Sequence, residues 1–149
     1  MRLLLSIAVC LLVTACGGSQ SGATDSLDAA LSAYEHNDPA RAQKEADALL
    51  ADSAAFNALD APQLCRLSLL LVRLNNDTPD GEANDASVAR CLTRARTLQP
   101  DSVNDFLRSL RGEDAGRLMV LDRVGSYMEI PRDSLVSAED TVPTDSLMH

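Results

Sequence analysis

The sequence predicts an all-α domain of five to six short antiparallel helices, arranged as a stack of helical hairpins or as an irregular bundle. Apolar residues recur at helical spacing along most of the chain, and no segment has the alternating pattern of a strand. Asp38-Pro39 and Asp60-Ala61-Pro62 each place a capping carboxylate before a proline, which has no N–H to lose in a first helical turn. One stripe is so apolar that its helix is expected at the centre of the domain: Leu64, Leu67, Leu71 and Leu74.

Six helices are expected in chain order, covering about 25–35, 39–50, 61–75, 85–98, 102–111 and 118–124. Asp25 or Ser26 can cap the first of them, and Ser102 with Asp105 has the spacing of a capping box at the start of the fifth. Gly112 ends the fifth, because glycine accepts the left-handed conformation that often follows a helix. The connections are short, so each helix folds back on its predecessor.

The N-terminus combines one basic residue, Arg2, with an apolar run, Leu3–Leu12. A membrane-spanning helix needs about 20 apolar residues, whereas this run has the length of a signal-peptide core. The next four residues, Val13-Thr14-Ala15-Cys16, resemble the bacterial lipobox. That resemblance implies cleavage before Cys16 and attachment of acyl chains such as palmitate to it; an ordinary signal peptide is the alternative.

The lipobox resemblance implies a lipoprotein of the bacterial cell envelope that faces the periplasm and is held at the membrane by its N-terminal lipid. Gly17 is not the aspartate that resembles an inner-membrane retention signal, which favours the outer membrane in a Gram-negative cell. We expect a signal peptide over 1–15, a flexible tether over 16–24, a helical domain over 25–125 and an acidic, disordered tail over 126–149.

The charge and the polar residues exclude several functions. The formal net charge is −9, which argues against nucleic acid as a partner, since phosphates require a basic surface. His36 and His149 are the only histidines, and the chain has neither a Cys/His cluster nor a G-x-S-x-G nucleophile motif. We therefore expect no catalytic residues, no bound metal and no cofactor: the protein is predicted not to be an enzyme.

With Cys10 removed and Cys16 acylated, Cys65 and Cys91 remain in a compartment that permits disulfides. If the third helix ends near Asn75 and the fourth starts near Ala83, they lie about 15 Å and about 12 Å from the connecting turn, at similar heights. We expect a disulfide that closes a loop of about 25 residues and contributes on the order of 3 kcal/mol. Two buried free thiols are the alternative.

Two segments are similar to the tetratricopeptide repeat. Residues 26–50 carry small, aromatic, turn and apolar residues in that family's order, and 88–100 resembles the second half of another repeat. Pro39 replaces the usual aromatic residue, and 75–84 is a long insertion between helices. The resemblance implies partner binding in a concave helical groove; a generic bundle of hairpins is the alternative.

Four arginines are candidates for such a partner groove: Arg66, Arg73, Arg90 and Arg94. They can receive an acidic peptide or a terminal carboxylate, or they can form salt bridges on an exposed face. The preferred function is a non-enzymatic interaction or scaffold module for an envelope protein or peptide. The alternative is a small-ligand pocket between the third and fourth helices, lined by Leu67, Leu71, Leu92 and Ala95.

Overall fold

The computed structural model describes residues 18–79 and 81–128. The predicted signal peptide, the acylation site at Cys16 and residues 129–149 of the predicted tail lie outside these ranges. The described residues form seven helices and no strand, which confirms the all-α prediction. The helices are α1 (Gly18–Glu35), α2 (Pro39–Ala51), α3 (Ser53–Ala58), α4 (Ala61–Asn76), α5 (Asp85–Leu98), α6 (Pro100–Ser109) and α7 (Glu113–Met128).

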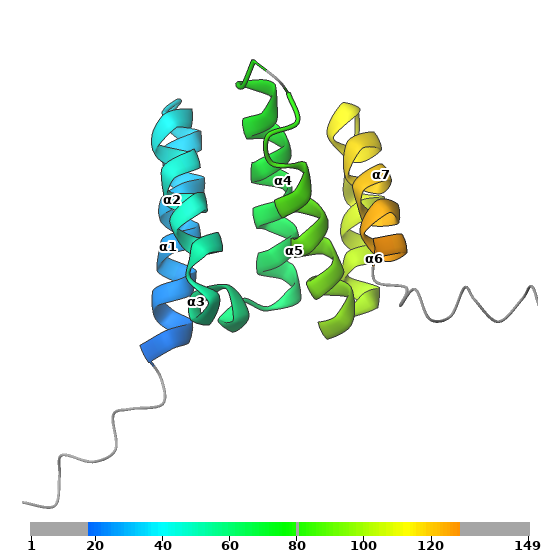
Figure 1. The fold of residues 1–149 in the computed structure, drawn as a ribbon, viewed down its shortest axis with the longest axis horizontal. Helices are drawn as coiled ribbons and strands as arrows, with labels where there is room; N and C mark the ends of the chain where they lie inside the picture. Colours follow the sequence, from blue (N-terminus) through cyan, green and yellow to red (C-terminus); the bar gives the residue numbers. More distant parts are fainter. Residues whose placement is uncertain (1–17, 80, 129–149) are drawn as a thin grey trace, which may run out of the picture.

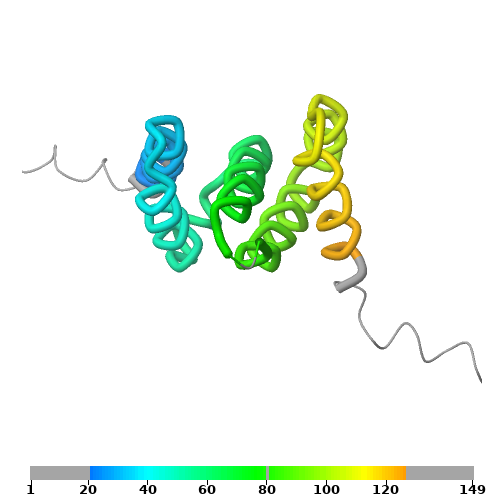
Figure 2. The backbone as a smooth tube through the Cα atoms, turned by 90° about the horizontal axis from the view of Figure 1, so that it is seen from above, coloured from blue at the N-terminus to red at the C-terminus, as the bar shows by residue number. Residues whose placement is uncertain are grey.

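The helices advance in one direction from α1 and α2, through α4 and α5, to α6 and α7 (Figures 1 and 2). The most extensive contacts join α1 to α2 and α4 to α5, whereas α7 packs mainly on α5. The short α3 lies at one end, between α2 and α4 (Figure 1). In this part of the chain, no helix is long and apolar enough to cross a membrane.

The predicted central helix is α4. Its buried residues cover most of its circumference and include Leu64, Leu67, Leu71 and Leu74. Asp60 and Gln63 form a reciprocal capping box at its start, where Asp60 Oδ1 accepts from Gln63 N at 2.8 Å and Gln63 Oε1 accepts from Asp60 N at 2.9 Å. Asp38 caps α2 in a similar way, by accepting a hydrogen bond from Arg41 N. Both predicted aspartate caps are therefore confirmed.

Three predicted helix starts are wrong. Helix α1 begins at Gly18, so residues 18–24, expected in the tether, are helical. Ala23 is buried and continues the apolar stripe of Leu27, which explains the earlier start, and Ser26 is no cap because its Oγ donates to Gly22 O within the helix. Helix α6 begins at Pro100. Helix α7 begins at Glu113 and continues to Met128, past the expected domain boundary at 125.

Each of these last two helices starts early for a visible reason. Ser102 Oγ donates to Gln99 Oε1 at 2.7 Å, so the predicted capping box at Ser102 does not form, and Pro100 instead occupies the first turn. In α7, Ala115 is buried, so the packed face extends a turn before the predicted start.

Side-chain hydrogen bonds connect the two ends of the insertion between α4 and α5. Buried Asn75 accepts from Asn84 N at 2.8 Å and donates to Asp85 Oδ1 at 2.8 Å. Asn84 in turn exchanges two hydrogen bonds with Gln43 of α2, and Asp85 pairs with Arg117 of α7. A buried amide group without a hydrogen-bond partner destabilises the folded protein, so these bonds are expected to be kept. The cluster therefore fixes where α5 starts relative to the end of α4.

The predicted disulfide between Cys65 and Cys91 is wrong for this structure, since both are buried free thiols. Cys65 lies 11 residues before the end of α4 and Cys91 six residues after the start of α5, so they are about 17 Å and about 9 Å from the loop. The helix ends differ from the predicted ones by one or two residues. As a result, the two cysteines lie at different distances from the loop along their helices. Cys91 instead has a side-chain hydrogen bond with Ser68, about one turn beyond Cys65.

Burial should make both thiols unreactive in the folded protein. Desolvation raises the pKa of Cys65 to about 11 and that of Cys91 to about 12, from an ordinary value of 9.0. At pH 8, iodoacetamide should therefore leave both unmodified in native protein, and should alkylate both in urea without reductant, as read by peptide mass spectrometry. A Cys65–Cys91 linked peptide under non-reducing conditions would contradict the free thiols.

Candidate functional site

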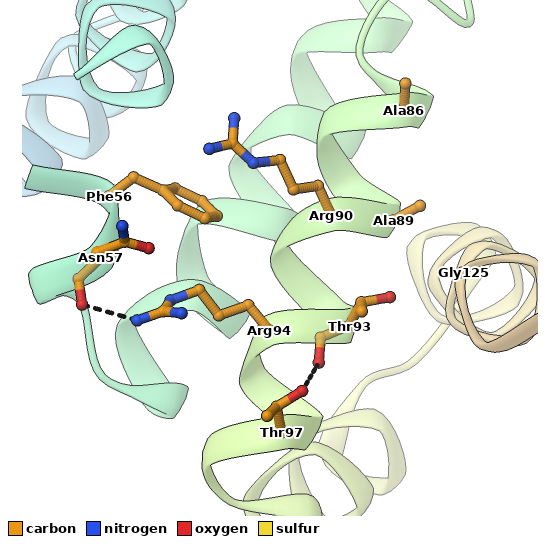
Figure 3. Close-up of a pocket in the computed structure, with 9 residues that line it drawn as sticks. All are labelled: Phe56, Asn57, Ala86, Ala89, Arg90, Thr93, Arg94, Thr97 and Gly125. Atoms are coloured by element: carbon orange, nitrogen blue, oxygen red, sulfur yellow. Dashed lines mark hydrogen bonds between the residues drawn. The ribbon is translucent and has the colours of Figure 1, made fainter. Parts of the chain in front are cut away.

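An open groove of about 520 Å³ follows α5 (Figure 3). Helix α5 supplies six of its lining residues, α3 contributes two and α7 contributes one. The residues that line it are Phe56, Asn57, Ala86, Ala89, Arg90, Thr93, Arg94, Thr97 and Gly125. Two are basic and none is acidic, so the groove is cationic although the whole chain is strongly acidic.

Helix α3, which forms one wall, is absent from the predicted elements. Asp52 caps it by accepting hydrogen bonds from Ala54 N at 2.9 Å and Ala55 N at 3.0 Å. Phe56 is buried and belongs to the main core, so it anchors the helix, while Asn57 is exposed. An aspartate followed by small residues and one aromatic residue was the available signal, but a helix of six residues is too short to show periodicity.

Two arginines of α5, Arg90 and Arg94, reach across the groove toward α3 (Figure 3). The guanidinium carbon of Arg90 lies 4.0 Å from the ring centroid of Phe56, and Arg90 Nη1 donates to Leu50 O at 3.2 Å. This is a cation–π contact. Arg94 Nη2 donates to Asn57 O at 2.8 Å. The two side chains therefore hold α3 against α5 through neutral groups.

Neither arginine is neutralised by a salt bridge within the described residues. Their partners are two backbone carbonyl groups and one aromatic ring. In addition, the Nε atom of Arg94 is buried without a hydrogen-bond partner from the described chain. Because this atom is shielded from solvent, an added acceptor would have to bind the Nη groups of Arg94, which carry four of its five N–H donors.

Helix α7 forms the opposite wall and approaches α5 closely at Gly125. A Cβ atom built on this glycine would lie 2.7 Å from Thr93 Oγ1 and 3.3 Å from Ala89 O. Nearby, Arg96 of α5 pairs with Asp122 of α7 through two hydrogen bonds, Nε to Oδ1 at 2.6 Å and Nη2 to Oδ2 at 2.5 Å. The glycine permits the close contact, and the bidentate pair maintains it.

The four predicted groove arginines do not share one surface. Arg90 and Arg94 line the groove, whereas Arg66 and Arg73 do not. Arg66 Nη2 lies 3.6 Å from Asp28 Oδ1 of α1, and Arg73 Nε lies 3.0 Å from Asp114 Oδ2 of α7. For Arg66 and Arg73 the salt-bridge alternative therefore holds. Their partners lie on α1 and α7, and the spacing of residues in the sequence does not show that these helices lie beside α4.

The residues predicted to line a small-ligand pocket instead pack together in the hydrophobic core. The four residues are each 0% exposed and belong to one hydrophobic cluster: Leu67, Leu71, Leu92 and Ala95. None of them lines the groove. The groove residues that sequence reasoning missed come mainly from α3 and α7, whose positions depend on tertiary packing.

The described residues contain no cluster of three or more potential metal-ligating side chains. The predicted lipid site at Cys16 is outside the described ranges. Comparison with known proteins identifies no relative: no family model, no curated protein and no solved structure matches the chain.

Two glycines of α7 provide a matched test of the α5–α7 contact. Gly125→Ala should lower the free energy of unfolding by about 1–3 kcal/mol, because the new methyl group overlaps Thr93 Oγ1. Gly116→Ala meets nothing within 4 Å and should raise it by about 0.5–1 kcal/mol through helix propensity alone. Urea titration measures both; equal stabilisation by the two changes would contradict the close approach.

Proposed function

We propose that this protein is a lipid-anchored, non-enzymatic interaction module of the bacterial cell envelope, which binds an acidic segment of an envelope protein or peptide along the α5 groove. One observation carries the proposal: the groove contains two guanidinium groups without salt bridges, and its lining has no carboxylate. An acidic side chain can accept hydrogen bonds from the guanidinium groups of Arg90 and Arg94.

The rest of the lining suits a peptide. Ala86 and Ala89 present methyl groups, while Thr93 and Thr97 combine a methyl group with a hydroxyl group. The groove is open to solvent, which a bound peptide requires in order to enter and leave it. Apolar contacts can thus contribute affinity, while the arginines select for carboxylates and fix the position of the segment.

The tetratricopeptide resemblance is part of this proposal. Two well-packed antiparallel pairs, α1 with α2 and α4 with α5, succeed one another along the molecule, and α6 and α7 follow (Figure 2). A stack of this kind offers extended concave surfaces for partners. The inserted α3 distinguishes this chain from a simple repeat, and it contributes one wall of the groove.

The location is proposed from the N-terminal sequence, because Val13-Thr14-Ala15-Cys16 resembles a lipobox. Lipid at Cys16 would attach the domain to the outer membrane of a Gram-negative cell, or to the cytoplasmic membrane of a Gram-positive cell. Either membrane would hold the groove close to envelope partners.

Cys16→Ala should abolish incorporation of a radiolabelled fatty acid and release the protein from the membrane fraction. The helical domain should stay folded, because the described core begins at Ala23. Far-UV circular dichroism of the released protein supplies the control. If the variant still incorporates labelled fatty acid and remains in the membrane fraction, the lipoprotein assignment is wrong.

A photoreactive amino acid at the exposed position Thr97 should capture one reproducible partner in native envelopes. Capture should fall by about tenfold or more with Arg90→Ala/Arg94→Ala, since charged hydrogen bonds to the partner are lost. Arg66→Ala/Arg73→Ala is the matched control, because it also removes two charges but leaves the groove intact. Equal loss in both double variants would show that the groove is not the binding surface.

A further inference from the structure

The groove has a second candidate occupant within the same chain, the segment 129–149 that follows α7. We propose that this segment binds along the α5 groove of its own molecule through its carboxylates, in contact with Arg90 and Arg94, and so competes with an external partner. The inference rests on the proposed use of the groove as an acidic-peptide site, but it does not depend on who the partner is.

The composition of segment 129–149 is complementary to the groove. Arg132 is its one basic residue apart from His149, whereas five residues are acidic: Glu129, Asp133, Glu139, Asp140 and Asp145. The groove has two guanidinium groups without salt bridges and no acidic lining residue. Apolar residues between the acids, such as Ile130, can contact the methyl-lined part of the groove.

The direction of α7 brings this segment to the groove. Helices α5 and α7 run the same way, because Asp85 at the start of α5 pairs with Arg117 early in α7, and Arg96 near the end of α5 pairs with Asp122 further along α7 (Figure 1). Gly125, which follows, itself lines the groove. A Cβ atom on Gly125 would lie 2.7 Å from Thr93 Oγ1 and 3.3 Å from Ala89 O, so the last turn of α7 lies beside the middle of the groove and not at a remote face.

The distances are within easy reach. Glu129 is four residues beyond Gly125, so even a fully extended chain separates them by at most about 14 Å. Along α5 the groove extends from Ala86 to Thr97, a helical rise of about 16 Å. About five extended residues cover that length, and the segment has 21.

Covalent attachment favours this occupant over a separate acidic chain. A short linker gives the attached segment an effective concentration in the millimolar range, so even weak contacts lead to substantial occupancy. A separate acidic chain must also approach a protein with a formal net charge of −9. An external partner would then have to displace the attached segment, which lowers its apparent affinity without any change in the groove.

The test uses the full mature chain, purified, with the photoreactive amino acid at Thr97. Cross-linked peptides mapped by mass spectrometry should contain residues 129–149. The same amino acid at Lys44, an exposed residue of α2 that does not line the groove, is the control and should give about tenfold less of this product. Equal yields at the two positions would overturn the proposal.

Charge variants identify the contacts. Neutralising the segment with Glu129→Gln, Asp133→Asn, Glu139→Gln, Asp140→Asn and Asp145→Asn changes no residue of the described fold, and should lower the Thr97 product by about tenfold. Arg90→Gln/Arg94→Gln should do the same, and Arg66→Gln/Arg73→Gln should not. An unchanged yield in the neutralised chain overturns the proposal even if the groove variants fail to fold.

Mixing isotope-labelled and unlabelled chains shows whether binding is within one molecule. Products that join labelled to unlabelled chains as often as chance allows would overturn binding in cis. Partner capture in envelopes is a separate readout: if the neutralised chain captures its partner more strongly, competition is supported. If partner capture occurs but neutralisation does not affect it, the proposed function stands and this inference fails.

Discussion

The burial of α4 is the constraint on which the rest of the fold depends. Its apolar residues face almost every direction, so no single neighbour can remove them from water. Helices α1, α2, α5, α6 and α7 all contact it. Because α5 packs more extensively on α4 than any other helix does, burial of its inner face leaves the opposite face of α5 exposed between α3 and α7, and that face is the floor of the groove.

Polar groups then determine the positions that hydrophobic burial leaves undecided. Apolar contacts between two helices tolerate sliding, whereas hydrogen bonds at set distances do not. Asn75 and Asn84 connect the end of α4 to the start of α5, and the Arg96–Asp122 pair positions α7 on α5. The groove walls are therefore set by a few directional contacts between helices that are already packed by apolar residues. Its two arginines remain without salt bridges, and no acidic residue lines the groove beside them.

Sequence reasoning succeeded where the relevant interaction is local. Aspartate caps, proline in the first helical turn and the α4 stripe all involve residues within about two helical turns, so α2, α4 and α5 were predicted with nearly correct bounds. It failed for α3, because a helix of six residues is too short for its apolar residues to repeat at helical spacing. It also failed for the disulfide. There, helix ends displaced by one or two residues changed the relative height of Cys65 and Cys91.

The sequence by itself determined the all-α class, the central helix, the acidic character and the two arginines one turn apart on α5. Only the tertiary structure decided that Arg90 and Arg94 face an open groove, while Arg66 and Arg73 pair with carboxylates. The reason is physical: helical spacing shows which side chains share a face, but what opposes that face depends on residues about 30 to 40 positions away, which packing and not periodicity brings together.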